Sequence, residues 1–130
     1  MTTETVVVIM FTYFIVKHFI CDFPIKIQTP WMFLNKGTYG HPGGMAHALI
    51  QGIASAPILI LTAGCSDITP WAGTLLVGEI LVHYHMDWFK IWLNKRNNYH
   101  PQTPQFWTLL GIDQLVHYLT YVGMTVVWLW

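Results

Sequence analysis

The stretch TVVVIMFTYFIVKHFICDF (residues 5–23) decides the fold, because a long apolar run carries a histidine and an aspartate near its end. At about 1.5 Å of rise per residue, a helix of this length crosses about 30 Å of hydrocarbon. His18 and Asp22 are four residues apart, so they lie on one face of that helix. The stretch therefore predicts a membrane-spanning helix with two ionisable side chains on one face.

Three further apolar segments follow, separated by turn-rich polar sequence. Their expected bounds are 45–63, 70–93 and 106–130. Pro24 ends the first segment, because proline cannot continue a helix, and Gly64 to Asp67 form a short turn between the second and the third. We expect an all-α membrane protein, a four-transmembrane-helix up-down bundle that forms one integral membrane domain over residues 1–130.

The composition supports a membrane protein. Hydrophobic residues make up 54% of the chain and charged residues only 9%, whereas soluble domains carry about 25% charged residues. A soluble helical bundle is the alternative, but so few charges cannot cover its surface. Six basic and six acidic residues leave no net charge, which excludes an electrostatic nucleic-acid footprint.

The sequence between the first two segments predicts a short helix in the membrane interface. Thr29 and Pro30 fit the N-cap and first helical position, and Gly37 fits the end of the helix. The apolar stretch WMFL (residues 31–34) lies between these signals, so its side chains would rest in the headgroup layer.

The basic residues predict the orientation. Five of the six lie in the first loop and at or after the end of the third segment: Lys26, Lys36, Lys90, Lys95 and Arg96. Short loops rich in Lys and Arg stay in the cytoplasm. We therefore expect both termini outside.

Three pairs of His and Asp, each four residues apart, lie in the apolar segments. They are His18 with Asp22, His83 with Asp87, and Asp113 with His117. His47 adds a seventh side chain, and in an up-down bundle all seven fall in the cytoplasmic half. Ionisable groups in a membrane face the interior and pair with one another or bind cations. We therefore predict a divalent metal site with one or two ions, zinc first and iron or manganese as alternatives.

Hydrogen-bonded His–Asp pairs that hold helices together are the competing interpretation. A single pair favours that interpretation, whereas three pairs and His47 at one depth favour metal. Glu79, one turn before His83, is a candidate general base, or a buried hydrogen-bonding residue. Lys90, one turn after Asp87, is expected to neutralise a substrate phosphate, or to extend its amine to the membrane surface.

The other histidines carry less weight. His85 is out of helical phase with the His83 pair, and His41 and His100 each precede a proline in a loop. Cys21 and Cys65 are far apart in the sequence and fit small buried residues.

Five motifs give the chain a family resemblance. They are HFICDF (18–23), QTPW (28–31) with Lys36 after it, HALI (47–50), HYHMDWFK (83–90) and DQLVH (113–117). The chain resembles an uncharacterised family of small membrane proteins from bacteria and tailed phages, catalogued as domain of unknown function 3307. The resemblance implies a location in the bacterial inner membrane and a role for these His and Asp positions. The spans rich in His and Asp are also distantly similar to those of small membrane-bound metal-dependent hydrolases. The chain lacks the His-Arg and Thr-His-Ser elements of that group.

We therefore expect a membrane-embedded metal-dependent hydrolase that acts on a lipid or lipid-linked substrate at the cytoplasmic interface. The alternative is a non-catalytic bacterial or phage membrane protein, in which a structural metal or His–Asp site serves binding to another membrane protein. Metal transport is disfavoured, because the ligands cluster at one end of the bundle.

Overall fold

The computed structural model describes residues 1–23, 29–65 and 71–130, and within these ranges it contains helices and no strands. The four long helices are α1 (Thr3–Asp22), α3 (Pro42–Thr62), α4 (Ala72–Arg96) and α5 (Pro104–Leu129). The short helix α2 (Pro30–Asn35) precedes α3, and the 3-10 turn η1 (Ala63–Cys65) follows it. The predicted all-α class is confirmed.

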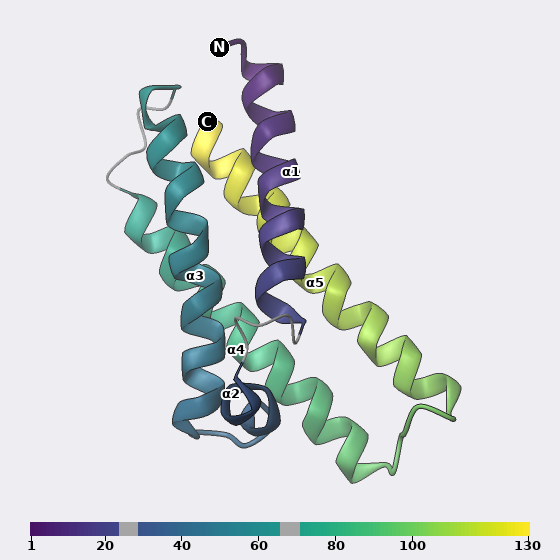
Figure 1. Cartoon of the computed structure of the whole chain (residues 1–130). Helices are drawn as coiled ribbons and strands as arrows, with labels where there is room; N and C mark the ends of the chain where they lie inside the picture. The colour runs from purple at the N-terminus through teal and green to yellow at the C-terminus, as the bar shows by residue number, and fades with distance from the viewer. Residues whose placement is uncertain (24–28, 66–70) are drawn as a thin grey trace.

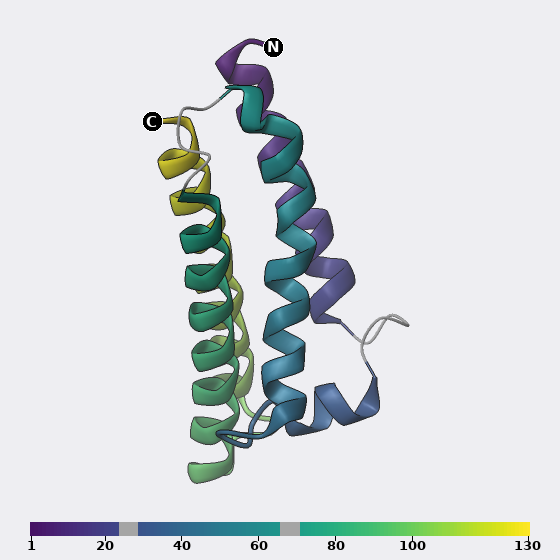
Figure 2. The same cartoon turned by 90° about the vertical axis from the view of Figure 1, so that its left-hand side faces the viewer.

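Consecutive long helices run in opposite directions and form a bundle (Figure 1). Helix α1 contacts α3 and α5, and α4 contacts the same two helices, so the four close a ring. Figure 2 shows α1 and α3 as one layer and α4 and α5 as the other. Both termini lie at one end of the bundle, and α2 lies toward the other end (Figures 1 and 2).

Local signals in the sequence set the helix ends. The Thr29 hydroxyl accepts a hydrogen bond from the Met32 amide at 3.4 Å, and Pro30 begins α2 as predicted. Helix α1 ends at Asp22, where Phe23 turns the backbone to an extended conformation. The predicted stop at Pro24 and the predicted turn at Asp67 lie outside the described residues.

Most of the described charged side chains lie inside the bundle, and many large apolar side chains lie outside. Seven of the described charged residues are buried: Lys17, Asp22, Lys36, Glu79, Asp87, Lys90 and Asp113. The exposed charges of the described residues are Glu4 at the terminal end and Lys95 and Arg96 at the opposite end. Each long helix exposes a valine or isoleucine by more than half, namely Val8 (64%), Ile53 (61%), Val77 (55%) and Val126 (56%).

Two helices, α1 and α3, are long and apolar enough to cross a membrane by length and composition. This finding supports membrane association. Helix α4 carries five charged residues, which are Glu79, Asp87, Lys90, Lys95 and Arg96. Its composition alone therefore does not mark it as a span, although three of these side chains are buried.

The interior of the bundle has an apolar half and a polar half. The apolar core, which includes Met10, Phe14, Ile58 and Trp128, lies toward the termini. The polar half begins at Lys17 and Glu79 and continues toward α2. The buried charged side chains of the described residues therefore all lie in one half of the bundle.

Candidate metal centre

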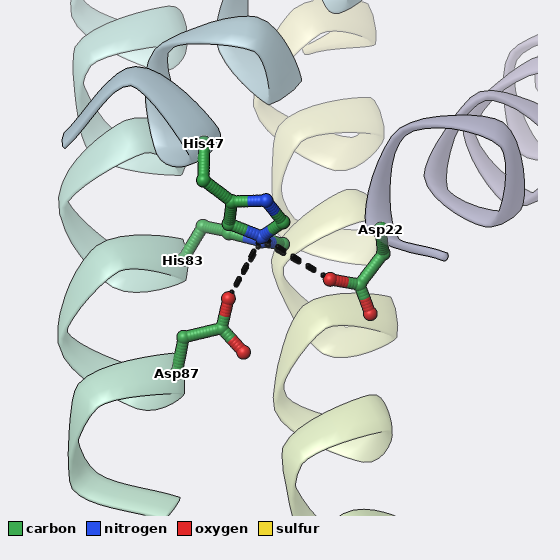
Figure 3. Close-up of side chains that lie close together, drawn as sticks. All are labelled: Asp22, His47, His83 and Asp87. Atoms are coloured by element: carbon green, nitrogen blue, oxygen red, sulfur yellow. Dashed lines mark hydrogen bonds and ion pairs between the residues drawn. The ribbon is translucent and has the colours of Figure 1, made fainter. Parts of the chain in front are cut away.

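Four of the predicted ligands form a compact buried group that connects three helices (Figure 3). Asp22 is the last residue of α1, His47 comes from α3, and His83 and Asp87 come from α4. Each offers one nitrogen or oxygen atom that lies within 4.8 Å of the others. The α4 pair is four residues apart, so one turn of helix presents both side chains to the same point.

Five of the six distances within this group are close to those around a tetrahedral ion, and the sixth, between Asp22 and Asp87, is within 4.8 Å. His47 Nε2 lies 3.0 Å from His83 Nε2, 2.8 Å from Asp87 Oδ2 and 3.2 Å from Asp22 Oδ1. His83 Nε2 lies 3.4 Å from Asp87 Oδ2 and 3.7 Å from Asp22 Oδ1. Bonds of about 2.0–2.1 Å to a tetrahedral zinc ion place its ligand atoms about 3.3 Å apart. The five distances scatter around that value.

A second group of candidate ligands contains Asp87, Asp113 and His117 and is also buried. His117 Nε2 lies 3.3 Å from Asp113 Oδ1. The Lys90 ammonium lies between the two carboxylates, 2.9 Å from Asp87 Oδ1 and 2.7 Å from Asp113 Oδ2. Asp87 thus belongs to both groups, and a lysine cation already bridges the carboxylates of the second one.

Several ligand atoms lie close to one another without forming hydrogen bonds. Asp87 Oδ2, Asp113 Oδ1 and His117 Nε2 are buried and have no hydrogen-bond partner among the described residues. His47 and His83 face each other through their Nε2 atoms, although at most one of two neutral rings can donate a proton there. A bound cation would satisfy these acceptor atoms, because each can donate a lone pair to it.

Lys36 reaches the first group from the end of α2. Its Nζ atom lies 3.4 Å from Asp22 Oδ1 and 3.4 Å from Asp87 Oδ2. Helix α2 packs closely on the start of α3, because a Cβ atom at Gly43 would lie 2.7 Å from the Trp31 carbonyl oxygen. Helix α3 begins at Pro42, three residues before the expected start at residue 45, and the glycines of its first turn let α2 and Lys36 approach closely.

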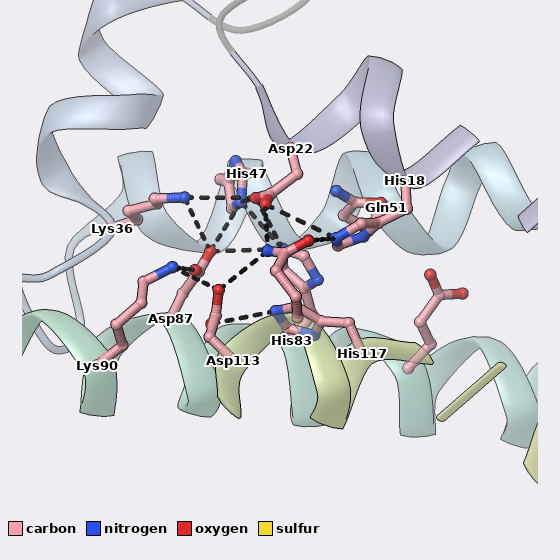
Figure 4. A network of polar contacts seen from close by, with 12 residues as sticks. His18, Asp22, Lys36, His47, Gln51, His83, Asp87, Lys90, Asp113 and His117 are labelled. Carbon is pink, nitrogen blue, oxygen red and sulfur yellow. Dashed lines mark hydrogen bonds and ion pairs between the residues drawn. The ribbon is translucent and has the colours of Figure 1, made fainter. Parts of the chain in front are cut away.

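The two lysines of the centre do not by themselves balance its aspartates. Three aspartates face two lysines, Lys36 and Lys90 (Figure 4). With neutral histidines, one negative charge remains in a buried environment, where an unpaired charge costs several kcal/mol. One divalent ion would change this to a single net positive charge.

His18, although predicted as a ligand, lies outside both groups. Its Nδ1 atom lies 3.0 Å from the Tyr121 hydroxyl, and its Nε2 atom lies 3.1 Å from Gln114 Oε1. The Gln114 amide donates to Asp22 Oδ2 at 3.2 Å and to Asp113 Oδ2 at 3.1 Å. Gln114 thus orients the two carboxylates that the ligand groups use, and His18 holds Gln114 in place.

Glu79, predicted as an additional polar group or base, forms a buried ion pair with Lys17. Lys17 also donates to Gln51 Oε1 and to the Tyr121 hydroxyl, each at 3.1 Å. Because Tyr121 also contacts His18, hydrogen bonds connect this ion pair to the candidate metal centre.

Four of these polar residues had a signal in the sequence that the prediction did not use. Gln51 and Tyr121 follow His47 and His117 by four residues, and Lys17 and Gln114 are direct neighbours of predicted ligands. Only their burial distinguishes them from ordinary polar residues.

The remaining histidines lie away from the centre. His41 is the N-cap of α3, and its Nδ1 atom accepts a hydrogen bond from the Gly43 amide at 3.0 Å. His85 is exposed and contacts the Leu81 carbonyl, and exposed His100 contacts Gln102 in the loop before α5. The prediction that His85 points away from His83 and Asp87 is confirmed.

Comparison with known proteins gives one family. The family described as "Protein of unknown function (DUF3307)" matches residues 10–130, which include every candidate ligand. No curated protein and no solved structure matches the chain.

Proposed function

The chain belongs to the DUF3307 family, and we propose that it is a membrane-embedded, metal-dependent hydrolase for a lipid or lipid-linked substrate. The observation that carries this proposal is the close approach of four buried candidate ligand atoms from Asp22, His47, His83 and Asp87, which suits one metal ion. A metal ion lowers the pKa of bound water toward 7 and polarises a carbonyl or phosphoryl oxygen.

We propose one ion, zinc, in the first group, with iron or manganese as alternatives. The mixed imidazole and carboxylate ligands suit all three metals. A second ion near Asp113 and His117 would have to displace the Lys90 ammonium, which lies between the carboxylates there. Asp22 Oδ1 is the outlying atom of the first group, 3.7 Å from His83 Nε2, so the coordination can open to water or substrate on its side.

Four membrane spans with both termini outside fit the charge distribution. Every long helix exposes large apolar side chains, while most of the charges lie inside. The exposed basic residues Lys95 and Arg96 lie at the end opposite to the termini, which the positive-inside rule assigns to the cytoplasm. The exposed Trp31 and Leu34 side chains of α2 would then rest in the cytoplasmic headgroup layer of a bacterial inner membrane.

One observation favours the non-catalytic alternative. Lys36 and Lys90 already contact the three aspartates, so the centre retains partial charge compensation without metal. In that case the cluster would hold the helices together, and the exposed apolar faces would bind another membrane protein.

Metal content and hydrolysis, measured on the same samples, separate the two functions. The full chain is purified in uncharged detergent, its metals are determined by elemental analysis, and it is assayed on lipid esters and lipid phosphates. A His47→Gln variant is expected to lose metal and hydrolysis together, while the exposed His100→Gln control keeps both. A folded, metal-free wild-type chain without hydrolysis would favour the alternative.

A further inference from the structure

A cavity of about 230 Å³ lies directly beside the candidate metal centre. Asp22, Lys36 and Lys90 line its polar side. Phe33, Phe106 and Leu110 line its apolar side. The cavity thus joins the site's two lysines to an apolar wall built from α2 and α5.

We propose that this cavity binds a membrane lipid through its phosphate group, which the two lysines hold next to the metal. The proposal rests on the proposed metal-dependent function and names its substrate class, a lipid phosphoester. The apolar chain of the lipid would lie along Phe33, Phe106 and Leu110.

The charge of the centre favours an anion once a divalent metal is bound and the histidines are neutral. The three aspartates and two lysines leave one negative charge, which a divalent ion turns into one positive charge. In an environment of low dielectric, this excess strongly favours a bound anion. A phosphate group accepts charge-assisted hydrogen bonds from lysine ammonium groups, which also line the cavity.

Asn94 supplies a further polar group for the ligand. It lines the same cavity, and its Oδ1 atom is buried without a hydrogen-bond partner among the described residues. The Asn94 Nδ2 group can donate to phosphate oxygens, whereas the buried Oδ1 atom can accept only from a hydroxyl, such as that of a protonated phosphate.

The apolar wall favours a lipid over a water-soluble phosphate. Lys36 Nζ lies 5.0 Å from the centre of the Phe33 ring, so charge and apolar surface adjoin within the cavity. A free phosphate ion would leave Phe106 and Leu110 without an apolar ligand, whereas the chain of a lipid would cover them.

Direct binding tests the proposal without any need for turnover. The zinc-loaded full chain in dodecyl maltoside is titrated with phosphatidic acid, with diacylglycerol and with inorganic phosphate, and zinc is determined in each sample. We expect phosphatidic acid to bind at least about tenfold more tightly than either control ligand. Equal binding of phosphatidic acid and diacylglycerol would overturn the phosphate site, and equal binding of inorganic phosphate would overturn the lipid.

Two variants locate the binding. Lys36→Gln is expected to weaken phosphatidic acid binding by about tenfold or more, while its zinc content stays at the wild-type level. The control Lys95→Gln removes an exposed lysine from the same end of the bundle and should leave both unchanged. Equal affinities for the two lysine variants, with zinc retained, would refute the cavity proposal but leave the metal function standing.

A further variant, Phe33→Ala, covers the case in which Lys36→Gln fails to fold. Phe33 is 37% exposed, so Phe33→Ala should fold and weaken phosphatidic acid binding without affecting inorganic phosphate. An unchanged affinity for phosphatidic acid would contradict the apolar wall. Absence of any bound zinc, iron or manganese from the wild-type protein would instead refute the proposed function itself, and the two failures are therefore distinct.

Discussion

Asp87 Oδ2 lies 2.8 Å from His47 Nε2, and this contact joins α4 to α3 at the centre of the candidate site. The other oxygen of the same carboxylate accepts a hydrogen bond from Lys90. Asp87 therefore faces the candidate metal site on one side and a lysine cation on the other. Such a carboxylate is well placed to control both metal affinity and the position of Lys90.

The two ligand groups predict different effects for two matched aspartate variants. Asp87→Asn should lower zinc affinity by about 100-fold or more, because it removes a charged ligand from the tetrahedral group. Asp113→Asn should keep stoichiometric zinc, because Asp113 belongs only to the group that Lys90 occupies. Zinc titration monitored by calorimetry checks both, and equal losses in the two variants would contradict the single-ion arrangement.

The buried ion pair of Lys17 and Glu79 predicts a strong stability effect. Glu79→Gln should destabilise the protein by about 3–5 kcal/mol, because it leaves the Lys17 ammonium buried without its counter-charge. Removal of both charges in a Lys17→Met/Glu79→Gln double variant should restore most of that loss. Unfolding in mixed micelles measures both effects, and the exposed Glu4→Gln change serves as the control. A double variant less stable than Glu79→Gln would contradict this explanation.

The close contact of α2 with α3 predicts a position-specific effect of alanine. Gly43→Ala should displace α2, because the new Cβ atom would lie 2.7 Å from the Trp31 carbonyl oxygen. Lys36 would move away from Asp22, so phosphatidic acid affinity should fall while zinc remains bound. The control is Gly111→Ala in α5, where the described structure has no atom within 4 Å of the added Cβ. If both alanine variants bind phosphatidic acid like the wild type, α2 does not position Lys36.

The proposed topology predicts opposite labelling of the two ends of α5. Single cysteines at Gln102 and Trp130, both exposed, are introduced after Cys21 and Cys65 have been replaced by alanine. In intact cells, an impermeant maleimide should label position 130 from outside and reach position 102 only after lysis. Labelling of both positions in intact cells would contradict the proposal that α5 spans the membrane.

The sequence alone determined the elements that depend on local rules. Proline, glycine and threonine signals gave the bounds of α2 because capping acts within a few residues. The apolar segments gave the four long helices to within a few residues of their observed ends. The i, i+4 spacing placed His83 and Asp87 on one face of a single helix, whatever that helix contacts.

Only the tertiary structure decided how the candidate ligands divide between sites. Helical spacing does not fix the rotation of one helix against its neighbours, and close contacts such as Gly52 against Ile80 set that rotation through packing. Packing placed His18 beside Tyr121 rather than in a ligand group, and it gave Glu79 the partner Lys17. It also brought Lys36 from a separate helix to Asp87, because charges distant in sequence meet only where the fold buries them together.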